Sequence, residues 1–205
     1  MEDFIEIYET EFELPKFHSK DILVFTSKNA VKSVFNQYPN VQFQKNTILC
    51  VGKKTEKCLK NKNLTVKHTA NSAKKLGEWL ILNNNNKQSV LHFCGNIKRK
   101  ELENILIKNQ VNYSEIEVYK TTLTPKKINK PFDGVLFLSP SGVKSYILAD
   151  NPSDKIVFCI GNTTANEAKK HFKQVIVSDK PSVENSIKII ENHYGNIQNK
   201  KIKSK

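Results

Sequence analysis

The chain has 205 residues, of which 38% are hydrophobic, and a formal net charge of +13. This length allows one large domain or two small ones, and the apolar content is sufficient for one or two cores. No apolar run approaches the roughly 20 residues that a membrane helix needs, so we expect no membrane-spanning segment. The acidic, alternating N-terminus MEDFIEIYETEFEL resembles neither a signal peptide nor a transit peptide.

The four cysteines, at positions 50, 58, 94 and 159, lack paired metal-binding spacing. Three of them close apolar, strand-like runs, which is typical of buried, reduced thiols in a cytosolic protein. The five histidines are scattered without a metal-binding pattern. We therefore expect a cytoplasmic protein that uses no metal and no cofactor.

The positive charge comes almost wholly from lysine, since Arg99 is the only arginine. Such a charge attracts anions. Sequence-specific DNA recognition relies mainly on arginine, however, and no RNA-recognition motif is present. The composition favours a small polyanionic ligand over nucleic acid. We also expect a monomer that does not associate with a membrane. Weak, nonspecific nucleic-acid binding remains an alternative.

Taken in chain order, the pattern first predicts an extended strand at 4–14, closed by Pro15. Buried strands at 22–26, 48–52, 64–68 and 89–94 then alternate with helices that begin near Ser27, span 53–60, begin at Ser72 and span 98–109. A long alternating strand follows at 112–123, and a linker at 124–131. Further strands at 134–138, 156–161 and 174–178 alternate with helices that begin at Ser141, at Thr163 and after Pro181 and Ser182.

Strands that alternate with helices predict a parallel sheet covered on both faces. Because two such blocks occur, we expect an α/β protein with two doubly wound, flavodoxin- or Rossmann-like domains joined by a two-stranded antiparallel connector. The expected boundaries are a connector strand at 1–15, a first domain at 16–112, a return connector strand at 113–124, a second domain at 125–196 and a disordered basic tail at 197–205.

The two blocks also repeat each other in sequence. DILVFTSKNAVKSVF at 21–35 returns as DGVLFLSPSGVKSYI at 133–147, with six identities in fifteen positions. ILCVGKKTEKCLK at 48–60 aligns in the same way with VFCIGNTTANEAK at 157–169. Two echoes in the same order indicate duplication of a larger unit.

Ligands of open parallel sheets bind beyond the carboxyl ends of the strands. At these positions the sequence has hydroxyls, glycines and helix N-termini, which suit anions. It has no carboxylate pair, nucleophile triad or phosphate-binding loop. Alternatively, each Ser or Thr is only a helix cap, worth about 1 kcal/mol. The candidate binding residues are Thr26, Ser27, Asn29, Gly52, Thr55, Gly95, Asn96, Ser139, Ser141, Gly142, Gly161, Thr163 and Thr164, with Lys28, Lys53 and Lys155 as possible charge partners or solvated side chains.

Five short motifs give the chain a family resemblance. FTSKNAV (25–31), VGKKT (51–55), VYKT (118–121), FLSPSGV (137–143) and CIGNTTA (159–165) resemble the uroporphyrinogen-III synthase family in order and spacing. The resemblance spans about residues 20–185. It implies two doubly wound α/β domains, the first discontinuous, joined by a two-stranded ladder. The family normally opens with a further strand and helix before the connector, so we expect the second domain to lack that unit.

The resemblance also implies an activity. Members of the family are cofactor-free hydro-lyases of heme biosynthesis, which cyclise hydroxymethylbilane, a linear tetrapyrrole polycarboxylate, to uroporphyrinogen III. The reaction loses water and inverts the terminal pyrrole ring through a spiro intermediate. Tyr119 in VYKT matches the family's functional tyrosine and is expected to assist departure of the hydroxyl, or else only to pack at a hinge. Thr55 and Thr164 would bind carboxylates or brace the glycine turns. The alternative function is a non-catalytic, duplicated α/β module that binds a polyanionic metabolite.

Overall fold

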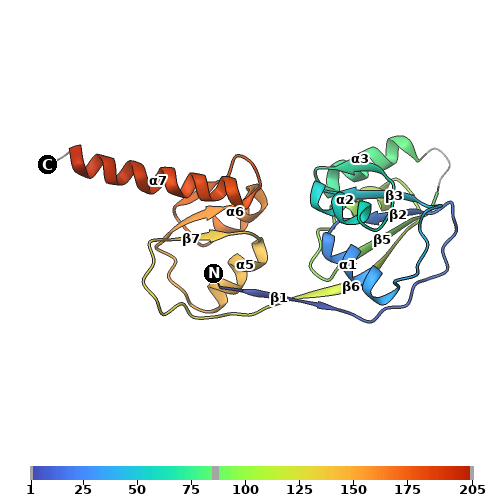
Figure 1. Cartoon of the computed structure of the whole chain (residues 1–205), viewed down its shortest axis with the longest axis horizontal. Coiled ribbons are helices and arrows are strands. Elements are labelled where there is room, and N and C mark those ends of the chain that lie inside the picture. The colour runs from blue at the N-terminus through green and yellow to red at the C-terminus, as the bar shows by residue number, and fades with distance from the viewer. Residues whose placement is uncertain (1, 85–87, 204–205) are drawn as a thin grey trace. The chain divides into compact units, whose positions relative to one another are not determined.

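The computed structural model of the chain describes residues 2–84 and 88–203 (Figure 1). Its internal contacts divide it into two compact units. We call Ile7–Thr121 the large unit, and the remainder, which combines the N-terminal residues with the chain after Thr121, the small unit. Within the described residues, no helix has the length and apolar character required to cross a membrane.

The large unit is a sheet covered by helices on both faces. Its strands are β2 (Ile22–Phe25), β3 (Thr47–Val51), β4 (Val66–Ala70), β5 (Val90–Gly95) and β6 (Tyr113–Leu123), and the helices are α1 (Lys28–Gln37), α2 (Lys53–Lys60), α3 (Ala73–Asn83) and α4 (Glu101–Lys108). The strand order is β6-β5-β2-β3-β4, with every neighbouring pair parallel and β1 (Ile5–Glu9) beside β6. One core lies between the sheet and α1 and α2, and the other between the sheet and α3 and α4.

The sequence explains why these elements form. All four residues of β2, Ile-Leu-Val-Phe, are buried, as expected of a strand with a helix layer on each face. Helix α1 begins where the Ser27 hydroxyl accepts the Asn29 N–H, and α3 begins where the Ser72 hydroxyl accepts the Lys75 N–H. The predicted helix starts at these two serines are confirmed.

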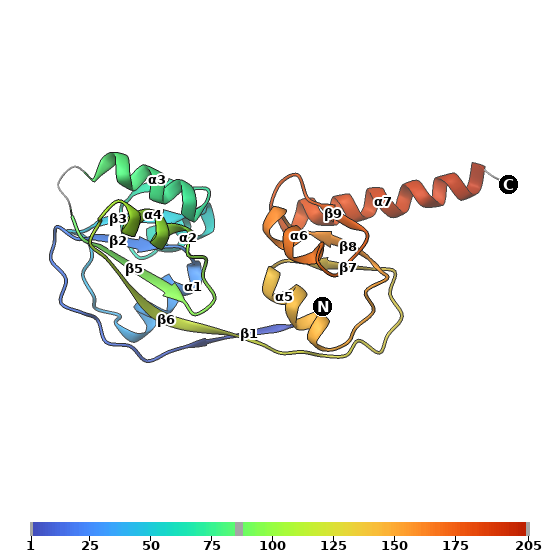
Figure 2. The same ribbon diagram turned by 180° about the vertical axis from the view of Figure 1, so that it is seen from behind.

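The small unit repeats this arrangement with fewer strands (Figure 2). Strands β7 (Gly134–Phe137), β8 (Ile156–Cys159) and β9 (Val175–Val177) form a parallel sheet in that order, and the helices are α5 (Pro140–Leu148), α6 (Asn162–Ala168) and α7 (Val183–Lys203). Helices α5 and α6 share a core with one face. On the other face, the rings of His193 and Tyr194 from α7 pack against Phe158.

The internal repeat is mainly a repeat of core packing. The order β2-α1-β3-α2-β4 in the large unit matches β7-α5-β8-α6-β9 in the small one. Identical positions that are buried in both copies include Phe25 and Phe137, Val31 and Val143, Ser33 and Ser145, Cys50 and Cys159, and Thr55 and Thr164. The repeated glycines differ, however, because φ is 83° at Gly52 and −178° at Gly161.

The two strands predicted to form a connector pair with each other, but their bounds differ from the predicted ones. Thr124 N–H bonds to the Phe4 carbonyl and Thr10 N–H to the Val118 carbonyl, so β1 and β6 run antiparallel. Strand β1 covers only Ile5–Glu9, not 1–15, because Phe12 and Leu14 turn away to pack against the core. Strand β6 does more than return the chain, since its first part is also the parallel neighbour of β5.

Three further predictions were wrong in detail. Helix α5 begins at Pro140 rather than Ser141, because the Ser139 hydroxyl caps it and proline suits the first helical position. Strand β4 is shifted two residues beyond the predicted 64–68, since Leu64 packs into the core before the strand starts. The expected disordered tail at 197–205 is helical as far as Lys203, because an existing helix is readily extended. Residues 204–205 lie outside the described residues.

Candidate functional site

The carboxyl ends of parallel strands bring the candidate residues together within each unit. Strands β5, β2 and β3 are neighbours, so the residues that follow them lie at one edge of the large sheet. Strands β7 and β8 do the same in the small sheet. The large-unit cluster contains Thr26, Ser27, Asn29, Gly52, Thr55, Gly95 and Asn96, and the small-unit cluster contains Ser139, Ser141, Gly142, Gly161, Thr163 and Thr164.

A β-bulge places Tyr119 at the large-unit cluster. Cys94 is paired with Glu117, but the next residue, Gly95, is paired with Tyr119, so Val118 is the extra residue of β6. Successive strand residues normally point to opposite faces. Because of the bulge, Val118 and Tyr119 instead pack into the same core, on the face that α1 and α2 cover. The bulge therefore turns the Tyr119 ring toward the end of β5.

The Tyr119 ring lies directly on Gly95. A Cβ atom at Gly95 would be 2.5 Å from Tyr119 Cζ and 2.9 Å from the hydroxyl oxygen, so only glycine leaves room for the ring. Burial raises the pKa of Tyr119, and a hydrogen bond with the Ser27 side chain only partly offsets this. Tyr119 is 9% exposed. The hydroxyl is thus protonated at neutral pH and able to donate a hydrogen bond.

Several other candidates are engaged within the chain. The Ser27 and Ser139 hydroxyls cap α1 and α5. The Ser139 hydroxyl oxygen accepts a hydrogen bond from the Gly142 N–H, with 3.1 Å between the oxygen and the nitrogen. The Asn96 amide group bonds to both the N–H and the carbonyl of Thr121, and so ties the end of β5 to β6. The capping role that the sequence left open is therefore real for both serines, and their part in ligand binding stays a prediction.

Two repeated threonines face inward. Thr55 is 4% exposed and Thr164 is 3% exposed, each in the first turns of its helix. In the large unit, the backbone of Gly52 accepts hydrogen bonds from Thr55 N–H and Glu56 N–H, and its own N–H bonds to Ala70. Such burial favours bracing of the turn over direct contact with a carboxylate. At Thr163 and Asn29 the side chains are more accessible.

A polar chain on the opposite face of β5 was missed by the sequence reasoning. His92 Nε2 is 2.9 Å from the Thr26 hydroxyl, and His92 Nδ1 is 2.8 Å from the Tyr113 hydroxyl. The Tyr113 hydroxyl donates to Glu115 at 3.0 Å, and Lys98 lies 2.8 Å from the other Glu115 oxygen. The available signal was a histidine in the middle of SVLHFC, an otherwise apolar buried strand.

The burial of this chain controls its protonation. Burial lowers the pKa of His92 to about 4, with Glu115 and Lys98 acting on it in opposite directions. Burial, together with the Glu115 charge, raises the pKa of Tyr113. Although burial acts to raise the pKa of Glu115, hydrogen bonds from Lys98 and Tyr113 lower it below its ordinary value. At neutral pH, His92 and Tyr113 are therefore neutral and Glu115 is ionised.

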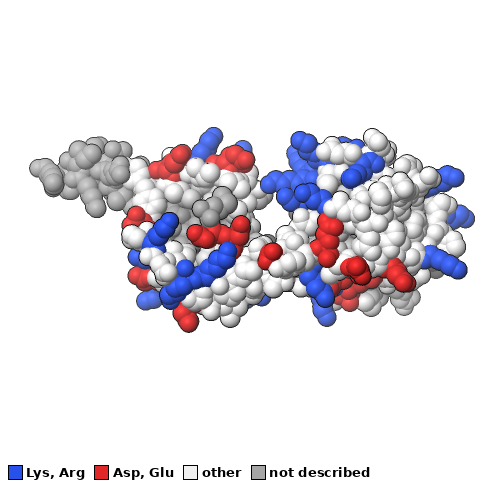
Figure 3. Space-filling model, turned by 60° about the horizontal axis from the view of Figure 1, so that its bottom comes forward, with Lys and Arg blue, Asp and Glu red and all other residues white. Residues whose placement is uncertain are grey.

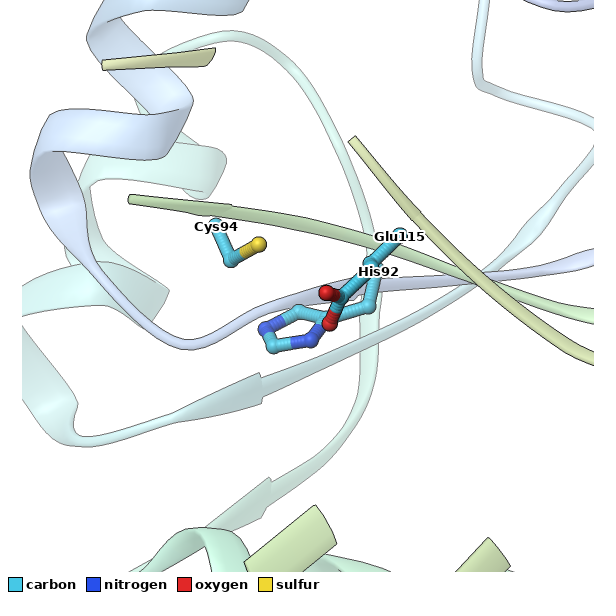
Figure 4. A group of neighbouring side chains, drawn as sticks. All are labelled: His92, Cys94 and Glu115. Atoms are coloured by element: carbon cyan, nitrogen blue, oxygen red, sulfur yellow. The ribbon is translucent and has the colours of Figure 1, made fainter. Parts of the chain in front are cut away.

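Three members of this region also lie close enough to hold a metal ion. The ligand atoms of His92, Cys94 and Glu115 all lie within 4.8 Å of one another, on adjacent strands β5 and β6 (Figure 4). Each already has a partner in the chain: both nitrogens of His92, both oxygens of Glu115, and the Cys94 thiol, which donates to the Ile116 carbonyl. Burial also raises the pKa of Cys94 to about 12, whereas metals bind thiolates. This donor set suits a hydrogen-bonded network better than a metal centre.

One cavity of the large unit does not coincide with the candidate residues. It measures about 760 Å³ and lies between the segment after β1 and the C-terminal end of α1, with Glu9, Glu11 and Glu13 in its lining. Three carboxyl groups would repel a polyanion. On the face drawn in Figure 3, acidic side chains lie among the basic ones, so the positive charge does not form one uniform surface there.

The fold defines an α/β protein with a parallel-dominated sheet, in which the candidate residues gather at the carboxyl ends of the strands. The family described as "Uroporphyrinogen-III synthase HemD" matches residues 4–188, and the chain belongs to this family. The chain is 27% identical over 195 residues to "Porphyrin biosynthesis protein HemD" of Ruminiclostridium josui, a match that covers 85% of this chain. It spans only 38% of the length of that curated relative.

Two solved structures share the fold. The uroporphyrinogen-III synthetase of Helicobacter pylori is similar with a TM-score of 0.72 and 22% identity, over 92% of this chain and 90% of that one. A mutant uroporphyrinogen III synthase of the extremely thermophilic bacterium Thermus thermophilus is similar with a TM-score of 0.62 and 13% identity, over 86% and 79%. These matches confirm the predicted α/β fold.

Proposed function

We propose that the chain is a uroporphyrinogen-III synthase, which cyclises hydroxymethylbilane with loss of water and inversion of the terminal pyrrole ring. Membership of the family supports this activity. The two units would be the two domains of the enzyme, with β1 and β6 as their connector. The substrate is a polycarboxylate, which suits a chain of net charge +13 and strand-end sites built from helix N-termini.

The single observation that carries the proposal is the placement of Tyr119. A β-bulge and the lack of a side chain at Gly95 together leave room for the Tyr119 phenol at the strand-end cluster, and burial keeps it protonated. A neutral hydroxyl that donates a hydrogen bond can assist departure of the substrate's terminal hydroxyl as water. Orientation of the reactive conformer by the surrounding groups supplies the rest, since orientation alone is worth up to roughly 7–11 kcal/mol.

The decisive experiment couples the full chain to enzymatic production of hydroxymethylbilane and measures the isomer ratio of the product. Hydroxymethylbilane closes unaided to the type I isomer, so we expect an excess of type III with the protein present. If a folded protein yields only type I, the chain is not a synthase. A polyanion-binding module without catalytic activity would then be the better description.

Tyr119→Phe tests the proposed role of the hydroxyl. We expect kcat to fall about a hundredfold, the low end of what general acids contribute. Tyr38→Phe is the matched control, because the Tyr38 hydroxyl donates to the Phe12 carbonyl elsewhere in the same unit. Wild-type rates for Tyr119→Phe would remove the role of this tyrosine and leave the enzyme assignment intact.

A further inference from the structure

The hydrogen bonds that link Thr26, His92, Tyr113, Glu115 and Lys98 allow only one assignment of donors and acceptors. Lys98 can only donate hydrogen bonds, and ionised Glu115 can only accept them. The Tyr113 hydroxyl donates its single proton to Glu115. Its oxygen must therefore accept the bond from His92, so the proton of the neutral imidazole lies on Nδ1. The carboxylate at one end thus determines the tautomer of the histidine.

The same reasoning determines the state of Thr26. With the proton on Nδ1, His92 Nε2 is bare and can only accept, so the Thr26 hydroxyl must donate to it. Thr26 is half-buried at the carboxyl end of β2, directly before Ser27. Since its proton is committed to His92, its oxygen can offer only lone pairs to a ligand. A carboxylate needs a donor, so Thr26 does not suit the acid arms of the substrate.

We propose that the Thr26 hydroxyl is an acceptor-only group that binds an N–H group of the substrate, and that Glu115, Tyr113 and His92 are positioning residues that hold it in this state. Given the proposed function, the matching N–H groups are those of the pyrrole rings. The acceptor would orient a ring, while helix N-termini hold the acid arms.

The assignment of donors and acceptors around His92 can be tested without an activity assay. Two-dimensional ¹⁵N NMR of the full chain with labelled histidine, assigned with His92→Gln, reports the tautomer directly. We expect neutral His92 with the proton on Nδ1 at pH 7 in the wild type. In Tyr113→Phe the acceptor for Nδ1 is lost, and we expect the proton to move to Nε2. An imidazolium, or a proton on Nε2 in the wild type, would refute the proposed assignment.

The role in substrate binding is tested at Thr26. Thr26→Val keeps the shape and removes the hydroxyl, and we expect KM to rise about tenfold, as for loss of one hydrogen bond, with kcat less affected. Thr26→Ser restores an acceptor, and KM should return to within about twofold of the wild type. An unchanged KM in Thr26→Val would overturn the binding role even if the NMR result holds.

Two experiments distinguish this proposal from failure of the proposed function and from a metal site. If the wild type produces only the type I isomer, the proposed function fails. The NMR spectrum still shows which nitrogen of His92 carries the proton, and so tests the hydrogen-bond assignment independently. Titration with zinc alone tests the other use of these side chains. We expect no stoichiometric binding. One equivalent of zinc bound by the wild type and lost in Cys94→Ser would replace the hydrogen-bonded chain with a metal site.

Discussion

Acidification should destabilise the large unit through His92. His92 is 3% exposed and burial lowers its pKa from 6.5 to about 4, so the unfolded chain binds a proton there before the folded chain does. The stability that depends on neutral His92 is fully present above pH 6.5 and is lost as the pH falls toward 4. At about 1.4 kcal/mol for each unit of pKa, the loss amounts to about 3 kcal/mol.

The matched variant is His92→Gln, which retains a polar side chain but does not titrate. Trp79 on α3 is the only tryptophan, so its fluorescence in urea titrations reports unfolding of the large unit. Between pH 6.5 and 4, the unfolding free energy of the wild type should fall about 3 kcal/mol further than that of His92→Gln, because the remaining titrating groups are common to both. Equal slopes would refute the reasoning. If the variant does not fold, an NMR titration that gives His92 a pKa near 6.5 would refute it equally.

Four further substitutions test the geometry of the turns and the core. Gly52→Ala forces alanine to adopt φ near 83° and should cost about 1–2 kcal/mol of stability in urea unfolding, whereas Gly161→Ala, at extended φ, should cost much less; equal effects would contradict this. Gly95→Ala should displace the Tyr119 ring and lower kcat about tenfold or more in the isomer assay, with little further loss in the double variant with Tyr119→Phe. Ser145→Ala removes a buried hydroxyl that has no hydrogen-bond partner within the described chain, and should raise the unfolding free energy by up to about 1 kcal/mol, so a marked loss would show a hidden partner.

Local patterns in the sequence were enough to locate most elements. A continuous apolar run marked β2, and a run interrupted only by His92 marked β5. Ser27 and Ser72 marked the helix starts, because capping depends on residues within one turn. The errors arose where distant contacts compete with local preference. Leu64 is drawn into the core, so β4 starts later than its β-branched residues suggested.

The candidate site divides in the same way. The clustering of candidate residues at the strand ends followed from the parallel order of strands alone, since consecutive βα units place those ends at one edge. The contact between Gly95 and Tyr119 did not follow, because it depends on a register shift between two strands. Nothing local to VYKT or to FCGN signals which residue is skipped.

The sequence by itself determined the α/β class, the duplicated strand–helix order and the family, because these depend on periodicity and on motifs contained in short segments. Only the tertiary structure decided which way Tyr119 points, how Thr26, His92, Tyr113 and Glu115 join into one chain, and which glycine lacks room for a side chain. These features depend on pairing between β2, β5 and β6, strands far apart in the sequence. One residue of slip in that pairing reverses the face on which a side chain lies.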